Sequence, residues 1–291
     1  MSDSPLPFAS IQNDLLRLDY LTTTGPRIIG LYAKGVEGNV LAETPHVHWP
    51  TPHGEFYLRG GHRLWVSPED ERFICPEEEL QVIEDSGRLV LRSPVDAAGL
   101  EKEISIQLDQ NCVHLSHRVT WHGNDPVELA SWGITQLRLG GMVILPLTPM
   151  DGLLPDRNLV LWPYTKLNDE RLELHDDMIL LRGTGLEHAC KIGNLNSAGW
   201  GACALGDVLF TKRFHTDEMA IHADLGCNVE AYVKDLCIEL ENLSPLKKLK
   251  KGDSVTHQET WQVTPGNFPA TLETARMISR QHQKHQGVFN G

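Results

Sequence analysis

The chain has 291 residues, 41% of them apolar, and a formal net charge of −13 at pH 7. Such a length and apolar content allow one large core, because all-β folds of this size often form a single domain. Nucleic acid is excluded as a partner, since phosphate binding requires clustered lysines and arginines. A membrane partner is also not expected, because the most apolar short run, Met142–Leu147, is too short to cross a bilayer.

Short segments of alternating apolar and polar residues, separated by turns, dominate the chain. They recur about every ten residues from Leu15 to Val263, and turn sequences such as Asp85-Ser86-Gly87-Arg88 separate them. This spacing predicts a large antiparallel β-sandwich. The clearest expected strands are Leu89–Ser93, Glu103–Leu108, Cys112–Trp121 and Gln258–Val263.

Two histidines near the N-terminus allow one alternative interpretation. His46 and His48 share one face of an expected strand, and His53 and Glu55 follow, which resembles the ligand run of a cupin metal site. Glu55 lies seven residues beyond His48 with two prolines between them, and no second cupin motif follows. The main interpretation therefore contains no metal and no cofactor, and a cupin-like metal enzyme is the less favoured alternative.

The segment Gly60–Glu69 combines two glycines, a histidine, an arginine, a tryptophan and a glutamate. The planar guanidinium of Arg63 can hold hydroxyls or a carboxylate, and Trp65 can stack on an apolar ring face. The glycine pair permits backbone angles that place such side chains at the mouth of a cleft. The segment predicts a small-molecule site for a carbohydrate. Its alternative is a strand end with a surface salt bridge and a buried tryptophan.

Aromatic residues next to glycine or proline form a second group of candidates. Trp132 precedes Gly133, while Trp162 and Tyr164 flank Pro163. Aromatic residues at such strand ends can form stacking platforms for a sugar, or they can belong to the core.

Three cations with apolar neighbours could contact an anionic group of the ligand. They are Lys191, Lys212 and Arg213. Each could instead form an ion pair at the surface, so the sequence leaves open whether the sugar is phosphorylated or acidic.

The segment Asp235–Leu246 contains two carboxylates separated by one residue. On a strand, Glu239 and Glu241 share a face because side chains alternate, and Ile238 and Leu240 then face the core. Mutual repulsion raises at least one carboxyl pKa, which suits general acid–base catalysis. The pair could also hold sugar hydroxyls, or form a polar strand face toward water.

The C-terminal region differs from the rest of the chain. After Pro265-Gly266, the run Pro269–His285 has apolar residues at helical spacing, which predicts a helix docked on the sandwich. We therefore expect residues 1–264 to form the sandwich and residues 265–291 to form a helix and polar tail of the same domain.

The six cysteines and the N-terminus indicate the compartment. The cysteines have no Cys-x-x-Cys pair and no regular spacing, which indicates reduced, mostly buried thiols. Met1–Phe8 lacks the basic region and apolar stretch of a signal peptide. These features predict a cytoplasmic protein, whereas the oligomeric state leaves no signal in the sequence.

Several segments together resemble the galactose mutarotase-like (aldose 1-epimerase-like) superfamily. Thr24–Leu31 and Gly38–Glu43 are similar to the opening strands of that superfamily, and Gly61–Trp65 lies where its substrate-binding arginine occurs. Cys237–Glu239, followed by the strand Gln258–Val263, is similar to the segment with its catalytic base. The resemblance is strongest to a branch that shares Gly-Gly-His-Arg-Leu-Trp and Glu-Leu-Glu-x-Leu-x-Pro-Leu.

The resemblance implies a β-supersandwich of two large antiparallel sheets with a sugar groove on one face. Mutarotases open the sugar ring by removing the anomeric proton while protonating the ring oxygen. By similarity Glu239 is the base, with Glu241 as the alternative, and Arg63 binds sugar hydroxyls. The implied function is a mutarotase-type carbohydrate site, acting as an aldose or sugar-phosphate 1-epimerase.

One departure from the family pattern concerns the catalytic acid. The family uses a histidine in a His-x-Tyr context, and the matching region here offers Trp132, whose indole is not an acid near neutral pH. Two interpretations follow. Either His62 supplies the proton, although the adjacent Arg63 should depress its pKa, or the protein is a non-catalytic carbohydrate-binding or regulatory protein.

Overall fold

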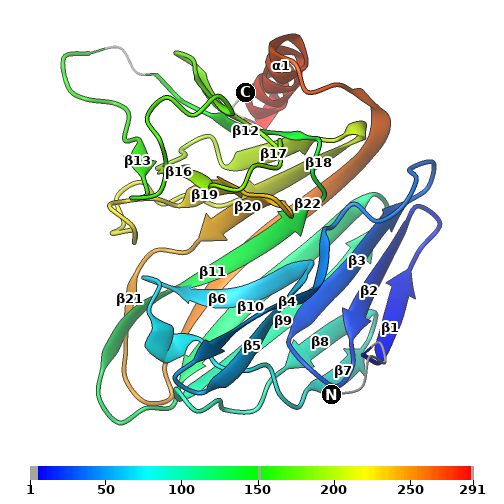
Figure 1. Ribbon diagram of the computed structural model, residues 1–291, viewed down its shortest axis with the longest axis vertical. Helices are drawn as coiled ribbons and strands as arrows, with labels where there is room; N and C mark the ends of the chain where they lie inside the picture. The colour runs from blue at the N-terminus through cyan, green and yellow to red at the C-terminus, as the bar shows by residue number, and fades with distance from the viewer. Residues whose placement is uncertain (1–5, 150–151, 290–291) are drawn as a thin grey trace.

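The computed structural model describes residues 6–149 and 152–289. Two large antiparallel sheets lie against each other and enclose the main hydrophobic core, with one helix at the C-terminal end (Figure 1). This arrangement confirms the predicted all-β architecture of two large antiparallel sheets and a C-terminal helix. Residues 1–5, on which the signal-peptide expectation partly rested, lie outside the described residues.

The first sheet carries most of the residues expected at the site. It contains ten strands, and its neighbours pair antiparallel throughout. In spatial order they are β1 (Phe8–Gln12), β2 (Leu16–Leu21), β3 (Arg27–Ala33), β6 (His62–Ser67), β11 (Val127–Leu137), β20 (Ile238–Leu243), β19 (Val229–Val233), β16 (Cys190–Asn194) and β13 (Val160–Leu161), with β21 (Lys247–Leu249) paired to the start of β11.

The second sheet also has ten antiparallel strands. In spatial order they are β14 (Leu172–Leu174), β15 (Met178–Arg182), β12 (Met142–Pro146), β17 (Trp200–Ala204), β18 (Gly206–Phe214), β22 (Ser254–Phe268), β10 (Cys112–Trp121), β9 (Leu100–Asp109), β8 (Arg88–Arg92) and β7 (Gln81–Asp85). The turn predicted between β7 and β8 is present, with φ of 50° at Ser86 and 82° at Gly87.

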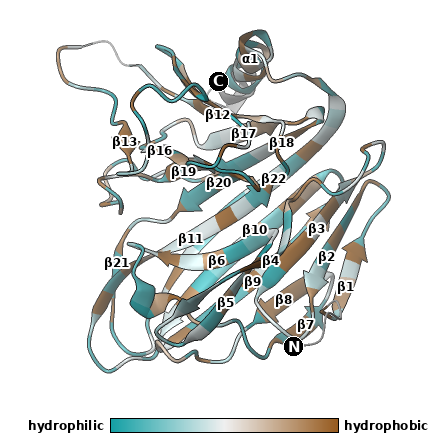
Figure 2. Ribbon diagram, viewed as in Figure 1, coloured by the Kyte–Doolittle hydropathy of each residue, from teal (hydrophilic) through white to brown (hydrophobic). Residues whose placement is uncertain are grey.

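The core forms where the inward faces of the two sheets meet. Apolar side chains such as Ile28 and Leu240 from the first sheet and Ile104 and Val113 from the second are fully buried there. The strands alternate between hydrophilic and hydrophobic residues along their length (Figure 2). Since successive side chains of a strand point to opposite faces, every second residue of each central strand faces this core. Each fully buried aliphatic side chain contributes about 1.5–3 kcal/mol to folding.

A tight glycine turn starts β6 and fixes which of its residues face outward. Gly60 and Gly61 have φ of 86° and 72°, which residues with a side chain rarely adopt. A Cβ at Gly61 would lie 1.9 Å from the carbonyl oxygen of Ile28. The buried Arg27 donates hydrogen bonds to the carbonyls of Leu58 and Gly60 and pairs with Glu77. Its guanidinium therefore anchors the backbone that leads into the turn.

Two smaller elements flank the first sheet. The hairpin of β4 (Glu43–Thr51) and β5 (Gly54–Gly60) forms a separate two-stranded sheet, and the 3-10 helix η1 (Glu71–Phe73) follows β6. Phe56 of the hairpin packs edge-on against Trp65, with ring centroids 5.4 Å apart. The hairpin therefore covers part of the outward face of the first sheet.

The helix α1 (Leu272–Phe289) docks on the second sheet, as its apolar spacing predicted. Ala275 and Ile278 are buried against Met142, Ile144 and Trp200 in a second apolar cluster. In the part of the chain that the structure describes, no helix is apolar and long enough to cross a membrane. All six cysteines are free thiols and five of them are buried, in agreement with the expectation from their spacing.

Candidate functional site

The outward face of the first sheet gathers polar side chains from several strands. Arg63 on β6 and Glu239 on β20 lie on either side of β11, and Arg63 Nη1 is 3.3 Å from Glu239 Oε1. Both side chains are largely buried but reach solvent, with 6% of the Arg63 side chain and 10% of the Glu239 side chain exposed. A small ligand could therefore reach both groups from outside.

A buried ammonium lies next to this pair. Lys191 on β16 forms ion pairs with Glu230 on β19, at 2.7 Å, and with Glu241 on β20, at 3.0 Å. The sheet order brings these strands together, and Glu230 lies opposite Glu241 in the register. Both carboxylates are fully buried. One ammonium thus faces two carboxylates in a region that excludes water.

Aromatic rings surround the ammonium of Lys191. Its Nζ lies 4.6 Å from the ring centroid of Trp132 and 4.5 Å from that of Trp162. Trp132 donates a hydrogen bond from Nε1 to Glu241 Oε2 at 2.8 Å and meets Trp65 edge-on. The Arg63 guanidinium lies 4.5 Å above the Trp65 ring. These contacts of cations over ring faces fix the side chains in place.

Two further residues form the rim. Tyr164 is 46% exposed, and its ring lies edge-on to Tyr232 of β19. Glu69, just after β6, is also exposed to solvent, and the charges of Lys191 and Arg63 act on its carboxyl group. The rim therefore offers the Tyr164 phenol, packed against Tyr232, and a carboxyl group next to the buried ion pairs.

Burial shifts the protonation of the carboxyl groups. It raises the pKa of Glu239; the Arg63 guanidinium opposes this rise and the Glu241 carboxylate adds to it. Burial also raises the pKa of Glu230 well above its usual range, and partial burial of its carboxyl raises that of Glu69. Burial disfavours the Lys191 ammonium, but the Glu230 and Glu241 carboxylates outweigh it and raise the pKa of Lys191. Because Glu230 shares the Lys191 ammonium with Glu241, the attraction of that one cation does not offset the effect of burial on the pKa of Glu230.

The site can therefore both accept and donate protons. Glu239 is a carboxyl group with a raised pKa at the edge of solvent, which suits a general base at neutral pH. Burial raises the pKa values of the Tyr164 and Tyr232 phenols, so both remain protonated hydrogen-bond donors. The site offers the half-exposed ring of Tyr164, a cation and an accessible base, which are groups suited to a polyhydroxylated ligand.

His62 and Lys212 do not lie with this group, although the sequence placed both among the site candidates. Side chains alternate on a strand, so His62 faces the interior while Arg63 faces outward. His62 Nε2 is 2.7 Å from His117 Nε2, and Lys212 Nζ is 3.1 Å from Glu259 Oε2. Burial, more than the adjacent Arg63, depresses the pKa of His62. Both residues belong to a buried cluster between the sheets.

Among the described residues, His62, His117 and Glu259 are the one set of ligand-type side chains close enough to surround a metal ion. The contacts favour a metal-free network. The two Nε2 atoms, 2.7 Å apart, are closer than the roughly 3.3 Å expected for two tetrahedral zinc ligands at about 2.0 Å. Glu259 also accepts a hydrogen bond from Trp261 Nε1 and pairs with the Lys212 ammonium, which supplies a cation's charge.

The cupin-like alternative is wrong about the fold, because two ten-stranded sheets replace the cupin barrel. His48 contacts Glu55 at 2.5 Å on the exposed β4–β5 hairpin, and His46 is exposed on the same strand. Metal-ligand candidates in the described part of the chain gather elsewhere, in the interior cluster.

Sequence reasoning missed two acidic residues of the outward group. Glu230 lies within the apolar run Val229–Val233, where a single carboxylate gives no local signal of a partner. Glu69 belongs to a segment that was recognised, but its place at the rim depends on the chain path after β6. The alternation of Glu230 with buried apolar neighbours could have indicated a buried charge, although not its partner Lys191.

Comparison with solved structures identifies the fold. The chain matches a galactose mutarotase-like protein from Lactobacillus casei with a TM-score of 0.55 and 10% identity, over 89% of this chain and 100% of that one. It matches the Slr1438 protein from Synechocystis sp. PCC 6803 with a TM-score of 0.54 and 12% identity, over 90% and 97% of the two chains. A provisionally assigned aldose 1-epimerase from Escherichia coli K12 matches with a TM-score of 0.52 and 10% identity, over 89% and 99%.

Comparison by sequence gives no relatives. No protein-family model matches the chain, and no curated protein matches it. At these identities the structural matches establish a galactose mutarotase-like sandwich, which is the fold that the sequence motifs implied.

Proposed function

From the galactose mutarotase-like fold and the outward-facing polar group, we propose that the chain binds an aldose on the first sheet and interconverts its anomers. The observation that carries the proposal is the contact of Glu239 with Arg63 at the edge of solvent. Arg63 binds sugar hydroxyls, and Glu239 accepts the anomeric proton, because its raised pKa makes it an effective base near neutrality.

Ring opening also needs a proton donor for the ring oxygen. Trp132 stands where mutarotases have their acidic histidine, and its indole donates a hydrogen bond to Glu241 instead. The group at the rim that fits the role is Glu69, because its raised pKa increases the population of the neutral acid. The phenol of Tyr164 remains protonated and orients the ring by hydrogen bonding.

A second candidate function is carbohydrate binding without catalysis. It is favoured by Trp132, and by Lys191, which is held rigidly between two carboxylates and two indoles. Binding at a site held in this way does not require a proton transfer. The two candidates share one binding site and differ only in whether the anomeric proton leaves.

The test measures binding and turnover separately. Isothermal titration with neutral aldoses, uronic acids and sugar phosphates identifies the ligand, and NMR exchange between its anomers measures mutarotation. We expect Glu239→Gln to lower the exchange rate by about 10³-fold while binding persists, and Glu69→Gln to lower it by about 10²-fold. The matched control is Glu173→Gln, a half-buried ion-paired glutamate on the second sheet. Binding without accelerated exchange in the unmodified protein would establish the second candidate, and no binding to any sugar would overturn both.

A further inference from the structure

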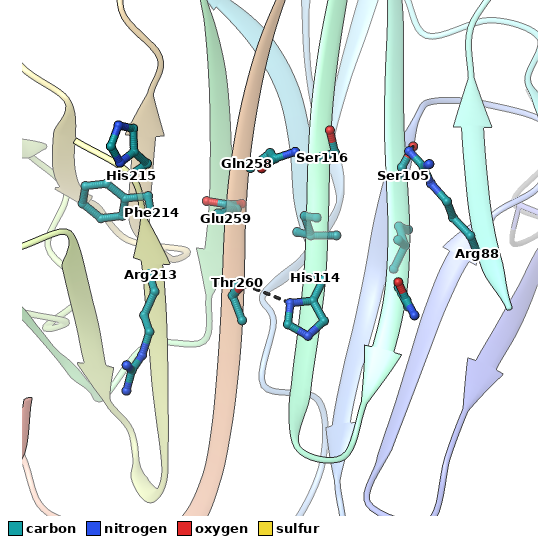
Figure 3. A pocket seen from close by; sticks show the side chains of 13 residues that line it. Arg88, Ser105, His114, Ser116, Arg213, Phe214, His215, Gln258, Glu259 and Thr260 are labelled. Atoms are coloured by element: carbon teal, nitrogen blue, oxygen red, sulfur yellow. Dashed lines mark hydrogen bonds between the residues drawn. The ribbon is translucent and has the colours of Figure 1, made fainter. Parts of the chain in front are cut away.

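We propose that the second sheet carries a separate binding groove on its outward face for an acidic oligosaccharide. An open groove of about 560 Å³ crosses strands β18, β22, β10, β9 and β8 (Figure 3). It lies on the other sheet from Arg63 and Glu239, so it is distinct from the proposed aldose site. The apolar cluster under α1 lies on β12, β15 and β17 and reaches Leu209 of β18 and Phe268 of β22, but it contains none of the residues that line the groove.

The register of the strands arranges the lining side chains in rows across the groove. In the first row, Arg213 lies opposite Thr260, Thr260 opposite His114, and His114 opposite Gln107. Figure 3 shows the hydrogen bond between His114 Nδ1 and Thr260 Oγ1, which measures 3.0 Å. Because opposed residues of paired strands share a face, the row presents one polar side chain per strand.

A second row runs parallel to the first. Gln258 lies opposite Ser116, and Ser116 opposite Ser105. Arg88 of β8 reaches this row and donates a hydrogen bond to Ser105 Oγ at 2.8 Å (Figure 3). Hydroxyl and amide groups both donate and accept hydrogen bonds, so the two rows match a ligand with many hydroxyls.

The charge of the groove determines the class of ligand. Within the described residues, neither Arg88 nor Arg213 forms an ion pair with a carboxylate; Arg88 donates a hydrogen bond to Ser105 Oγ, and Arg213 donates one to Gln262 Oε1. Glu259 borders the groove through its backbone only, because its side chain is buried and paired with Lys212. Two uncompensated guanidinium groups in a chain of net charge −13 attract acidic groups on a ligand.

The width of the groove favours a chain-like ligand. The strands that carry Arg88 and Arg213 lie four spacings apart, or about 19 Å at about 4.8 Å per spacing, and the two side chains reach inward to Ser105 of β9 and Gln262 of β22. A monosaccharide cannot bridge them, whereas an oligosaccharide can. Single-stranded nucleic acid fits less well, because Phe214, the one phenyl ring lining the groove, is 8% exposed and offers no open stacking surface.

The test titrates the protein with a hexamer of galacturonic acid, with its fully methyl-esterified form, with galacturonic acid itself and with a single-stranded DNA hexanucleotide. We expect the acidic hexamer to bind, the neutral ester to bind at least tenfold more weakly, and the monomer to bind more weakly still. Raising the salt concentration from 50 mM to 500 mM should also weaken hexamer binding several-fold, because charge pairing at an open surface is screened.

Variants localise the binding. Arg88→Gln combined with Arg213→Gln should weaken hexamer binding at least tenfold with an unchanged melting temperature. Arg72→Gln, which changes an exposed arginine of η1, should leave hexamer binding unchanged. Glu239→Gln should also leave it unchanged, which separates this groove from the aldose site. No binding of the hexamer, equal binding of its ester, equal binding by the double variant, or tighter binding of the DNA would each overturn the proposal.

Discussion

The Arg63 guanidinium lies 3.3 Å from the Glu239 carboxylate, and this contact joins residues 176 positions apart in the sequence. It exists because β6 and β20 both pair antiparallel with β11, one on each edge of that strand, and the two side chains point to the same face of the sheet. The contact also opposes the effect of burial on Glu239, so that its pKa is raised by less than burial alone would cause. The proposed base is therefore held in place and tuned by one neighbouring cation.

Removal of the Lys191 ammonium should destabilise the fold. Lys191→Met leaves Glu230 and Glu241 buried without a cation, and we expect the free energy of unfolding to fall by about 3–5 kcal/mol. Urea denaturation measures the change. Adding Glu230→Gln and Glu241→Gln to the variant should restore part of the loss, whereas a loss below about 1 kcal/mol in Lys191→Met would contradict the account of this cluster.

The glycine turn before β6 should tolerate no side chain. Gly61→Ala places a Cβ 1.9 Å from the Ile28 carbonyl oxygen at a φ of 72°, so we expect a loss of about 3 kcal/mol or more in the free energy of unfolding. The matched control is Gly87→Ala, which has a φ of 82° but no heavy atom within 4 Å. There the backbone strain alone should cost about 1 kcal/mol. Equal losses in the two variants would contradict the role of close packing at Gly61.

Sequence periodicity was sufficient for the architecture and for part of the site. Alternation predicted that Glu239 and Glu241 share a face, and both contact residues of the outward group. The same alternation places His62 and Arg63 on opposite faces of the sheet, so these two neighbours in the sequence do not belong to one site. His117 shares a face of β10 with the buried Val113 and Val119, so its burial could also have been predicted from the strand pattern.

The pairing of distant strands was not predictable from local pattern. Lys191 and Glu230 lie on short apolar strands, and they meet only because β16 and β19 are neighbours in the sheet. Lys212 pairs with Glu259 across β18 and β22 in the same way. A charge within an apolar strand signals that a partner exists, but the sheet order decides which residue it is.

The interior histidines should make stability depend on pH. Burial lowers the pKa of His117 to about 4 and that of His257 to about 3, and it lowers that of His62 well below the usual value. These histidines bind protons below about pH 6.5 in the unfolded chain and not in the folded chain, so their contribution to stability is complete above pH 6.5 and falls as the pH decreases toward 4. Each histidine should contribute about 1.4 kcal/mol per pH unit in this window.

Denaturant unfolding at pH 7.5 and pH 5.0 measures this effect. His117→Asn should reduce the loss between the two pH values, because one proton-binding group is removed from the unfolded chain. His46→Asn, on the exposed hairpin, should leave the loss unchanged. A loss as large in His117→Asn as in the unmodified protein would contradict the assignment.

Metal should be dispensable in the unmodified protein. The Lys212 ammonium balances the charge of Glu259, and the two imidazoles contact each other directly, so we expect neither a chelator nor added Zn²⁺ to change the melting temperature. Lys212→Met removes the ammonium and leaves two imidazoles and a carboxylate, so Zn²⁺ should then raise the melting temperature of the variant. Stoichiometric zinc in the purified unmodified protein, lost together with stability on chelation, would show that the cluster is a metal site.

The most direct test of the central claim is isothermal titration of the unmodified protein and of Arg63→Ala with the aldose panel. We expect one class of sugar to bind the unmodified protein, and Arg63→Ala to weaken that binding at least tenfold, while Arg213→Gln on the other sheet leaves it unchanged. Equal affinity of the unmodified protein and Arg63→Ala for every sugar would show that the outward face of the first sheet is not the carbohydrate site.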